Sequence, residues 1–467
     1  MPACSKVPGL QAQASCGLIS DMSLVDTIVS AATPPGTGGV SIVRISGDEA
    51  PRIGQRMLGE LPQPRVASLR SFTGPDGEPI DEGIALFFPA PGSFTGEPVI
   101  ELHGHGGPVV VALLVDAAVA NGARPAEPGE FSKRAFLNDK LDLAQAEAIA
   151  DLIGSGTSQA ARAALRSLSG EFSQAVNELV GQLTDLRVHV EAAIDFPEEE
   201  IDFLSDKQLL RRIDDCDAAF KALLATAAVG RVLRDGYRVV LVGKPNAGKS
   251  SLMNRLSGEE TAIVTEIAGT TRDVLRENID IDGLSVELVD TAGLRDNPDV
   301  IEKEGIRRAR EAMSSADAVL WIQDASEEDA GELREPVPEG VPVLIVRNKL
   351  DLVDGSLTDK KEGDMKVVEL SAKTGAGLDT LREHVKTLAG YKNLGEGALS
   401  ARRRHVNALQ RAADQFEAGR TALSETKAGE IFAEELRMAQ QSLGEITGAV
   451  SSDDLLGRIF ADFCIGK

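Results

Sequence analysis

The chain has few cysteines, and they lack the spacings that cysteines need to act together. The four cysteines form neither a metal-binding nor a redox pattern; they are Cys4, Cys16, Cys216 and Cys464. This usage suggests a reducing compartment, and we expect a cytoplasmic protein rather than a secreted one held by disulfides. Long apolar runs are also missing. No stretch approaches about 18 uninterrupted apolar residues, so no membrane-spanning helix is predicted.

Positive charge is scarce as well. The chain has 49 lysine and arginine residues but 73 aspartate and glutamate residues, which gives a formal net charge of −24 at pH 7. A broad basic surface for nucleic acid is therefore not expected. If the protein works on RNA, a partner must supply much of the affinity for phosphate. The length of 467 residues is enough for two to four domains with full cores.

The most informative motif lies in the middle of the chain. Residues Gly243–Ser250 read G-K-P-N-A-G-K-S and follow the apolar run Tyr237–Val242, which predicts a strand and then a phosphate-binding loop. Glycines let the backbone fold around an anion, so that successive N–H groups point at the phosphates. Lys249 can reach the β- and γ-phosphates, and the hydroxyl of Ser250 can bind Mg²⁺.

Three further motifs follow in the order expected of a nucleotide-binding domain. Asp290–Gly293 ends a predicted strand, and its acidic residue suits a place near Mg²⁺ and the γ-phosphate. Asn348–Asp351 follows another apolar run, and the Asp351 carboxylate can accept both N1–H and N2–H of guanine. Adenine offers neither donor, so we expect a preference for GTP on the order of 10⁴-fold. Ser371–Lys373 follows a third predicted strand and would back the base.

Together these four motifs predict a GTPase domain with a Ras-like P-loop fold. The expected GTP-binding residues are Gly243, Asn246, Ala247, Gly248, Lys249, Ser250, Ser251, Thr265, Glu266, Ile267, Ala268, Gly269, Thr270, Thr271, Asp290, Thr291, Ala292, Gly293, Asn348, Lys349, Asp351, Ser371, Ala372 and Lys373.

Two features depart from the pattern of small GTPases. Leu294 stands where a Ras-like enzyme carries the glutamine that orients the attacking water, so another residue must position that water. Residues 265–273 lie between the first and second motifs and offer Thr271 as the expected Mg²⁺ ligand in the GTP state. Asn246 has a side-chain oxygen near the phosphates, and an oxygen-rich segment facing it can hold a monovalent cation. Such a cation would replace an arginine finger and stabilise charge in the transition state.

The N-terminal region begins with a leader, residues 1–21, that is rich in alanine, serine and glycine and lacks the pattern of a secretory signal. We expect this leader to be disordered, and Met22 competes with Met1 as the start of the protein. From Asp26 to about Asn138 the pattern predicts a small α+β domain. Its expected elements are strands at 27–29, 40–45, 84–88 and 99–102 and a helix from residue 108.

Helical periodicity dominates on both sides of the GTPase motifs. A first apolar stripe predicts one long amphipathic helix and runs through Leu165, Leu168, Phe172, Val176, Leu179, Leu183, Leu186, Val190 and Ile194. The second runs through Phe432, Leu436, Ala439, Leu443, Ile446 and Val450. Neither half can bury its stripe alone, so we expect one bundle built from both, with the GTPase domain inserted between them. Two unrelated helical segments are the alternative. An insertion would let the nucleotide state move helices at both insertion points.

Several short peptides outside the GTPase motifs form a specific set. They are residues 26–29 (DTIV), 32–36 (ATPPG), 101–107 (ELHGHGG), 128–131 (PGEF), 134–138 (RAFLN), 140–143 (KLDL), 145–147 (QAE) and 463–467 (FCIGK). With these peptides the chain resembles, over roughly residues 22–467, the bacterial and organellar tRNA-modification GTPases called MnmE or TrmE.

The resemblance implies a concrete activity. Members of this family join a flavin-dependent MnmG/GidA partner in a heterotetramer and add a carboxymethylaminomethyl or aminomethyl group to C5 of the wobble uridine of certain tRNAs. Their N-terminal domain resembles the tetrahydrofolate-binding domains of one-carbon enzymes, forms a homodimer and binds 5-formyltetrahydrofolate or a related tetrahydrofolate. Their GTP hydrolysis is stimulated by K⁺ and uses Mg²⁺.

The resemblance also assigns roles to residues. Arg44, Glu101, Lys140 and Lys467 match the folate contacts, and Cys464 is a possible functional thiol. The residues that match the K⁺ ligands are Asn246, Thr265, Ile267 and Thr270, and the Mg²⁺ ligands are Ser250 and Thr271. Glu302 matches the catalytic glutamate that orients the hydrolytic water, with Glu304 as the alternative across a variable segment.

The predicted fold class is multidomain α/β plus α. The expected parts are the leader (1–21), a tetrahydrofolate-binding-like dimerisation domain (22–139), the first half of a discontinuous helical domain (140–233), an inserted GTPase domain (234–388) and the second helical half (389–467).

Two other functional classes and two local alternatives stay open. An Era-like ribosome-assembly GTPase shares the GTPase motifs, but no basic RNA-binding C-terminal domain is present. A folate-dependent one-carbon transferase is the other class, although the N-terminal region has no obvious catalytic set. His103 and His105 stand in a glycine-rich peptide that favours a tight turn over a metal pair, and Cys464 is either a reactive or a buried, inert thiol.

Overall fold

The computed structural model describes residues 26–195, 207–259, 275–290, 313–327, 337–338, 340–353, 359–362, 365–391, 398–450, 453–461, 463–464 and 466. The chain divides into two compact units. The N-terminal unit contains residues 1–141 and 454–467, and the bundle–GTPase unit contains residues 142–453. The leader lies outside the described residues.

The N-terminal unit is a six-stranded sheet with two helices on one face. Its elements are β1 (Ile28–Ala31), β2 (Gly38–Ser46), α1 (Ala50–Leu58), β3 (Ser68–Thr73), β4 (Pro79–Phe88), β5 (Val99–Gly106), α2 (Pro108–Ala120), β6 (Arg124–Pro125), α3 (Glu130–Leu137) and α13 (Asp453–Ala461). The strand order is β3-β4-β5-β2-β1-β6.

Alternation along the strands decides which side chains enter this core. Val43 and Ile45 of β2 are fully buried in one cluster with residues of α1 and α2. Arg44 lies between them in sequence and therefore points to the opposite face. The four predicted strands and the predicted helix are confirmed: β2, β4, β5 and α2 contain theirs, and β1 begins one residue later than the predicted 27–29.

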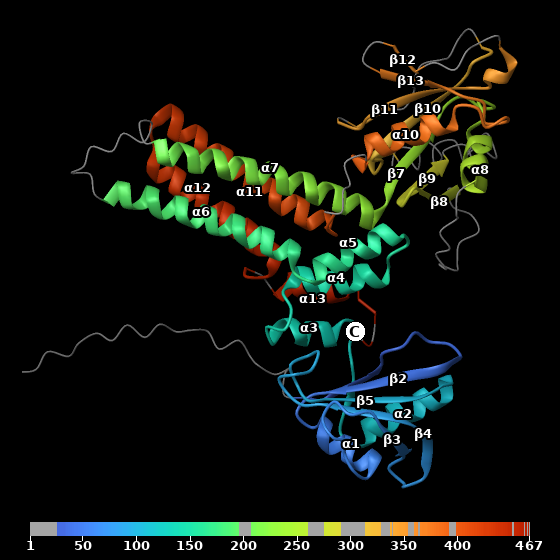
Figure 1. The fold of residues 1–467 in the computed structure, drawn as a ribbon, viewed down its shortest axis with the longest axis vertical. Coiled ribbons are helices and arrows are strands. Elements are labelled where there is room, and N and C mark those ends of the chain that lie inside the picture. Colours follow the sequence, from blue (N-terminus) through green and yellow to red (C-terminus); the bar gives the residue numbers. More distant parts are fainter. Residues whose placement is uncertain are drawn as a thin grey trace, which may run out of the picture. The chain divides into compact units, whose positions relative to one another are not determined.

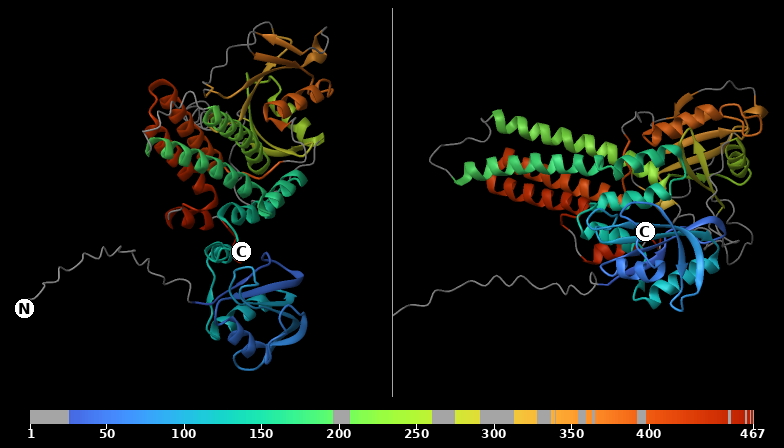
Figure 2. Two further views of the ribbon diagram at one scale, coloured as in Figure 1. Left: turned by 60° about the vertical axis from the view of Figure 1, so that its left-hand side comes forward. Right: turned by 60° about the horizontal axis from the view of Figure 1, so that its bottom comes forward.

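The bundle–GTPase unit starts and ends with helices. They are α4 (Leu143–Ile153), α5 (Ser158–Leu168), α6 (Glu171–Asp195) and α7 (Lys207–Asp235) before the GTPase sheet, and α11 (Arg403–Thr426) and α12 (Gly429–Thr447) after it. Helices α6, α7, α11 and α12 lie side by side (Figures 1 and 2) and share one hydrophobic core. Phe220, Phe416 and Phe432 meet in that core, and Phe172 packs against His405 elsewhere in it. The prediction of one bundle built from both halves of the chain is confirmed.

The first apolar stripe does not form one helix. Helix α5 ends at Leu168 and α6 begins at Glu171. Gly170 between them has a φ of 95°, a left-handed conformation that ends a helix at low cost only for glycine. Leu165 is 56% exposed and belongs to no core. At the end of the second stripe, Val450 lies beyond α12, because Gly448 takes a left-handed conformation and stops that helix.

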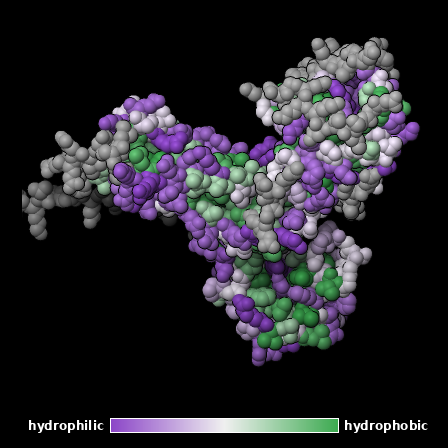
Figure 3. All heavy atoms as spheres, turned by 45° about the horizontal axis from the view of Figure 1, so that its top comes forward, coloured by the Kyte–Doolittle hydropathy of each residue, from purple (hydrophilic) through white to green (hydrophobic). Residues whose placement is uncertain are grey.

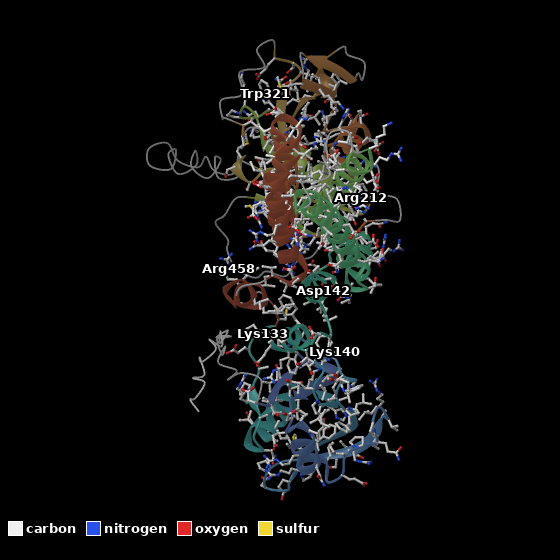
Figure 4. The ribbon with its side chains drawn as sticks, turned by 90° about the vertical axis from the view of Figure 1, so that its left-hand side faces the viewer. Lys133, Lys140, Asp142, Arg212, Trp321 and Arg458 are labelled. Atoms are coloured by element: carbon white, nitrogen blue, oxygen red, sulfur yellow. The ribbon has the colours of Figure 1, made fainter. Side chains whose placement is uncertain are left out.

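The GTPase sheet has seven strands. Its elements are β7 (Tyr237–Val242), α8 (Lys249–Glu259), β8 (Leu275–Ile281), β9 (Leu284–Asp290), β10 (Ala318–Asp324), β11 (Val343–Asn348), the 3-10 turn η2 (Leu350–Leu352), β12 (Asp359–Glu362), β13 (Met365–Glu369) and α10 (Leu378–Leu388). The strand order is β12-β13-β11-β10-β7-β9-β8, and the five inner strands are parallel. Helices α8 and α10 cover one face. Trp321 of β10 (Figure 4) is partly buried against the core of the other face.

The chain enters and leaves the GTPase sheet through adjacent segments. Residue Gly230 of α7 lies so close to the returning segment that a Cβ there would sit 2.0 Å from the carbonyl oxygen of Leu399. The Asp151 carboxylate on α4 accepts hydrogen bonds from Arg234 Nε at 2.8 Å, Arg402 Nη2 at 2.7 Å and Ser400 Oγ at 2.9 Å. One carboxylate therefore ties the last turn of α7 to the segment that returns to the bundle. We call this set of contacts the insertion junction.

A second buried carboxylate lies one turn earlier on α4. Glu147 accepts hydrogen bonds from Arg404 and from His405 Nε2, the latter at 2.8 Å. The Nδ1 of His405 accepts the backbone N–H of Arg402, so its ring proton lies on Nε2 and the imidazole is neutral. Burial lowers the pKa of His405 despite the nearby Glu147. Burial also acts to raise the pKa of Glu147, but the His405 and Arg404 contacts hold it far below its ordinary value.

We predict that Gly230→Ala destabilises the bundle. The added methyl group would overlap the backbone at Leu399, which cannot move without opening the insertion junction, so a loss of about 1–3 kcal/mol in free energy of unfolding is expected. Denaturation followed by circular dichroism would measure it. Gly181→Ala on α6 is the matched control, because its Cβ meets nothing within 4 Å. That change should stabilise the helix by about 0.5–1 kcal/mol, and equal effects of the two substitutions would contradict the close packing at Gly230.

Candidate functional site

The four predicted nucleotide motifs meet at one edge of the GTPase sheet. The carboxyl ends of parallel strands share an edge, and the loops that follow them form the usual ligand site of such sheets. The phosphate loop follows β7, Asp290 ends β9, Asn348 ends β11, and Ser371 comes two residues after β13. The central place of β7 puts the phosphate loop between the others.

Glycine is required in the phosphate loop. A Cβ on Gly243 would lie 2.2 Å from the carbonyl oxygen of Ile322, and one on Gly248 would lie 2.2 Å from Asn348 Nδ2. Asn246 takes a left-handed conformation with a φ of 64°. Lys249 is buried, and its ammonium donates to the carbonyl oxygens of Gly243 and Lys244, both at 2.9 Å. The ammonium thus lies across the loop, where phosphates would meet it.

Ser250 and Asp290 bring two kinds of oxygen together beside this loop. The Ser250 hydroxyl donates to Asp290 Oδ2 at 2.9 Å, and Asp290 is fully buried. A hydroxyl and a carboxylate in contact are the hard oxygen donors that Mg²⁺ prefers. The pair therefore fits a magnesium ion bound beside the phosphates.

Asn348 joins three of the loops through one side chain. Its Nδ2 donates to the carbonyl oxygen of Ala247 in the phosphate loop at 3.0 Å, and its Oδ1 accepts the N–H of Ala372 at 2.9 Å. The carboxamide is buried and uses both ends. The Asn348 side chain therefore fixes the positions of these loops relative to one another.

Two side chains of the Ser371–Lys373 segment hold the Asp351 carboxylate in place. Ser371 Oγ donates to its Oδ1 at 2.6 Å, and Lys373 Nζ lies 3.9 Å from Oδ2. The same Ser371 hydroxyl accepts the N–H of Thr374 at 3.2 Å, which fixes the direction of its proton toward Asp351. A carboxylate fixed in this way can meet two parallel N–H donors, as guanine presents them.

Sequence reasoning did not single out Asp324, which ends β10 beside this edge. Its Oδ2 accepts a hydrogen bond from Lys349 Nζ at 2.6 Å. Burial acts to raise the pKa of Asp324, but hydrogen bonds from Lys349 and Ser326 hold it below its ordinary value. The available signal was an acidic residue at the end of a strand that neighbours β7.

Several predicted site residues lie outside the described residues. These are Thr265, Glu266, Ile267, Ala268, Gly269, Thr270, Thr271, Thr291, Ala292, Gly293, Glu302 and Lys467. Leu294 and Glu304 also lie outside them. Ser251 is described and lies on the exposed side of α8.

A second cluster lies on the face of the N-terminal sheet opposite α1 and α2. Arg44 and Glu101 are directly paired across β2 and β5, and Arg44 Nε donates to Glu101 Oε1 at 2.8 Å. The guanidinium lies 5.5 Å from the ring centre of Phe94 and 5.7 Å from that of Phe131. Lys140 follows α3 (Figure 4), and its ammonium donates to the carbonyl oxygen of Pro91 on the segment that carries Phe94.

His103 and His105 lie in strand β5, so the tight turn predicted for them is wrong. His103 Nε2 lies 3.2 Å from Glu101 Oε2, and His105 Nδ1 lies 2.7 Å from Asp81 Oδ1 on β4. The glycines serve close approach within the sheet instead. A Cβ on Gly104 would lie 2.5 Å from Asp81 Oδ2.

The C-terminal segment packs within the N-terminal unit. The Gly129 N–H, just before α3, donates to the carbonyl oxygen of Cys464 at 3.4 Å. Gly466 has a φ of 95°, and a Cβ there would lie 2.0 Å from the carbonyl oxygen of Ala31. Ala31 pairs with Val43, the residue before Arg44. The Cys464 side chain is exposed, so the reading of a buried, inert thiol is wrong.

Family comparisons agree with both parts of this description. A family model described as "GTP-binding protein TrmE N-terminus" matches residues 27–140, and one described as "MnmE helical domain" matches residues 143–464. The chain belongs to the MnmE family. The GTPase motifs lie inside the second match, as the insertion predicts.

Two curated relatives support this membership over nearly the whole length. The tRNA modification GTPase MnmE of Pseudomonas syringae pv. tomato is 54% identical over 451 residues, which are 95% of this chain and 99% of the relative. That of Hydrogenovibrio crunogenus is also 54% identical over 451 residues, 96% of this chain and 100% of the relative. Among solved structures, an Era variant of Aquifex aeolicus bound to GDP and AlF4⁻ is 27% identical and covers 39% of this chain and 67% of that chain, with a TM-score of 0.27.

Membership of the MnmE family makes this chain a GTP hydrolase that acts in tRNA modification. The candidate GTP site consists of the phosphate loop, the Ser250–Asp290 pair and the Asn348–Asp351 segment, which we call the guanine loop. Within the part of the chain that the structure describes, no helix combines the length and the apolar character needed to cross a membrane.

We predict that Asp351→Asn exchanges nucleotide specificity. The amide would donate where guanine also donates, so GTP affinity should fall by on the order of 10²-fold or more. Xanthosine triphosphate offers a carbonyl there and should bind better than GTP. Competition against a fluorescent guanine nucleotide measures both affinities. Asp379→Asn on exposed α10 surface removes the same charge and should change neither affinity; unchanged GTP binding by Asp351→Asn would show that Asp351 does not read the base.

Proposed function

We propose that this chain is a K⁺-stimulated GTPase that modifies C5 of the tRNA wobble uridine together with a flavin-dependent MnmG/GidA-type partner, using the one-carbon unit of a tetrahydrofolate. The observation that carries this proposal is the presence, in one chain, of pre-positioned GTP loops and of the Arg44–Glu101 cluster with the C-terminal segment nearby. Era-like ribosome assembly accounts for the first but gives the second no use.

In this proposal, GTP hydrolysis depends on the protein groups and ions that surround the phosphates. Lys249 binds them, and Ser250 with Thr271 would hold Mg²⁺, with the buried Asp290 carboxylate behind the serine. Asn246 offers its oxygen at a left-handed position of the loop, where Thr265, Ile267 and Thr270 would complete a K⁺ site. These ions would supply positive charge against the charge that builds on the phosphate oxygens. Glu302 would accept a hydrogen bond from the attacking water and so orient it, the task that Leu294 cannot perform.

The N-terminal cluster suits a folate. Phe94 and Phe131 stand over Arg44, which gives the site aromatic surface beside a charged pair. Glu101 can accept hydrogen bonds from a ring that carries N–H donors, while Lys140 and the terminal Lys467 would attract the anionic tail of the ligand. The approach of Gly466 to Ala31, beside Val43 and Arg44, supports a role for the C-terminal segment at this site.

Exposed apolar side chains on the face of the N-terminal sheet opposite α1 and α2 support homodimerisation. Leu69 and Ile84 are paired across β3 and β4 and are 66% and 43% exposed. Ile84 is in turn paired with His103, which places these apolar side chains on the same face as Glu101. Figure 3 shows hydrophobic surface on this unit. A second copy could cover that face and the folate site together.

The insertion junction offers a route from GTP to tRNA chemistry. Because Asp151 ties Arg234 and Arg402 to α4, a movement of the GTPase sheet must act on α4, α7 and α11 together. Because the chain has a net charge of −24, its surface attracts the phosphates of tRNA weakly. The partner would therefore contribute much of the affinity for the tRNA phosphates.

We predict that hydrolysis is at least about tenfold faster in KCl than in NaCl at matched ionic strength, because losing one group that stabilises transition-state charge typically costs on the order of 10²-fold. Steady-state release of phosphate measures the rate. Asn246→Ala should remove the difference between the salts and leave the slow rate in NaCl. Equal rates of the native protein in the two salts would rule out the cation site.

We predict that Gly466→Ala abolishes wobble modification in cell tRNA and weakens binding of 5-formyltetrahydrofolate by about tenfold or more, because a Cβ would overlap the backbone of Ala31 and displace the C-terminal segment. Nucleoside mass spectrometry and calorimetry give the two readouts. GTP hydrolysis should stay within about twofold of the native rate, since the GTPase residues are untouched.

Gly457→Ala on α13 is the control, because its Cβ meets nothing within 4 Å. Deletion of residues 464–467 should reproduce the effect of Gly466→Ala. Full wobble modification by the deletion variant would show that the segment is dispensable.

A further inference from the structure

Asp324 is locked in place at the end of β10. Its side chain is only 9% exposed, and its Oδ2 lies 2.6 Å from Lys349 Nζ. Its Oδ1 accepts the N–H and the hydroxyl of Ser326 at 2.9 and 2.6 Å. Both carboxylate oxygens are therefore engaged, one by the turn that follows β10 and one by the guanine loop.

The last residues of β10 and the turn after it also contact the two loops on either side. The N–H of Ala325 donates to the carbonyl oxygen of Asn348 at 2.8 Å. The carbonyl oxygen of Ile322 lies so close to Gly243 of the phosphate loop that a Cβ at this position would overlap it. Since β10 lies between β7 and β11, its end separates the phosphate loop from the guanine loop and touches both.

Lys349 is the residue of the guanine loop that most needs support. Its φ of 67° is a left-handed conformation, which side chains other than glycine disfavour. Its four-carbon stem has many rotamers in solution, and the ion pair with Asp324 selects one of them. Fixing the ammonium in this way also restrains the backbone between Asn348 and Asp351.

We infer that Asp324 is a positioning residue for guanine-nucleotide binding, which acts through Lys349 to hold the Asn348–Asp351 loop beside the phosphate loop. Without it, the lysine and its loop have to be ordered when the nucleotide arrives, and that cost appears as lost affinity. The chemical step keeps Lys249, Ser250 and Asp290 and is not affected. A purely electrostatic role has the opposite sign, because removing a carboxylate near anionic phosphates would strengthen binding.

The test measures GDP and GTP affinity and steady-state hydrolysis for Asp324→Ala in the full chain. Affinity for both nucleotides should fall by about tenfold, the cost of ordering one long side chain and its loop. KM should rise with it while kcat stays within about twofold. Asp324→Asn, which keeps a neutral acceptor of the same shape, should recover part of the loss and serves if the alanine variant does not fold. Asp379→Asn, which breaks an exposed pair with Arg382, is the control for charge removal.

A double-mutant cycle separates this role from general support of the fold. If Asp324 acts through Lys349, Asp324→Ala combined with Lys349→Ala binds GDP no more weakly than Lys349→Ala alone. Additive losses, or native or tighter GDP binding by Asp324→Ala, would overturn the inference. So would a fall in kcat at unchanged KM, because it would place Asp324 in the chemical step.

Discussion

The bundle–GTPase unit depends on the buried carboxylate of Asp151, which holds both ends of the GTPase insertion. A buried charge is costly unless it is fully paired, and here two arginines and a serine satisfy it. Glu147, one turn earlier, does the same for Arg404 and His405. Removing Asp151 would break the contacts of α4 with both Arg234 and Arg402, so α4 fixes where the chain leaves the bundle and where it returns.

This constraint explains why the rest of the architecture can coexist in one chain. The two helical halves are separated by the whole GTPase sheet, yet their apolar faces form a single core because the ends of the insertion are held together at Gly230. The GTPase sheet has a hydrophobic core of its own, to which Val232 of α7 contributes. Within the described residues, the chain enters the sheet from α7 and returns to the bundle through residues 398–402, and both segments contact Asp151.

Much of the fold followed from the sequence, because local rules are strong where a motif leaves few choices. A phosphate loop needs glycine at Gly243 and Gly248 for steric reasons, and each nucleotide motif follows a buried strand. The prediction of one long helix through the first apolar stripe was wrong at Gly170. The spacing of apolar residues does not reveal that this residue takes a left-handed conformation and ends a helix. The ELHGHGG peptide read as a turn, although its glycines admit the Asp81 side chain and neighbouring backbone within a strand.

The contacts between distant residues were out of reach of such rules. Asp151 and Arg234 are 83 positions apart, and Asp151 and Arg402 are 251 apart, so no spacing or composition marks them as partners. The sequence did not identify Asp324 as a site residue for a related reason. An acidic residue at a strand end is common, and only its contact with Lys349 distinguishes Asp324. The role of Glu302 rests on the family resemblance alone, and Glu302 and the predicted cation ligands Thr265, Ile267 and Thr270 lie outside the described residues.

We propose that GTP hydrolysis reaches tRNA chemistry through the insertion junction, and the substitution Asp151→Asn separates the two activities. The amide keeps the shape and some hydrogen bonds of the carboxylate but loses its charge between Arg234 and Arg402. GTP hydrolysis by the purified variant and wobble-uridine modification in cells that carry it are measured side by side. We expect the variant to hydrolyse GTP at a rate within about twofold of the native protein and to modify tRNA about tenfold less or worse. Full modification by a variant that hydrolyses GTP normally would contradict it.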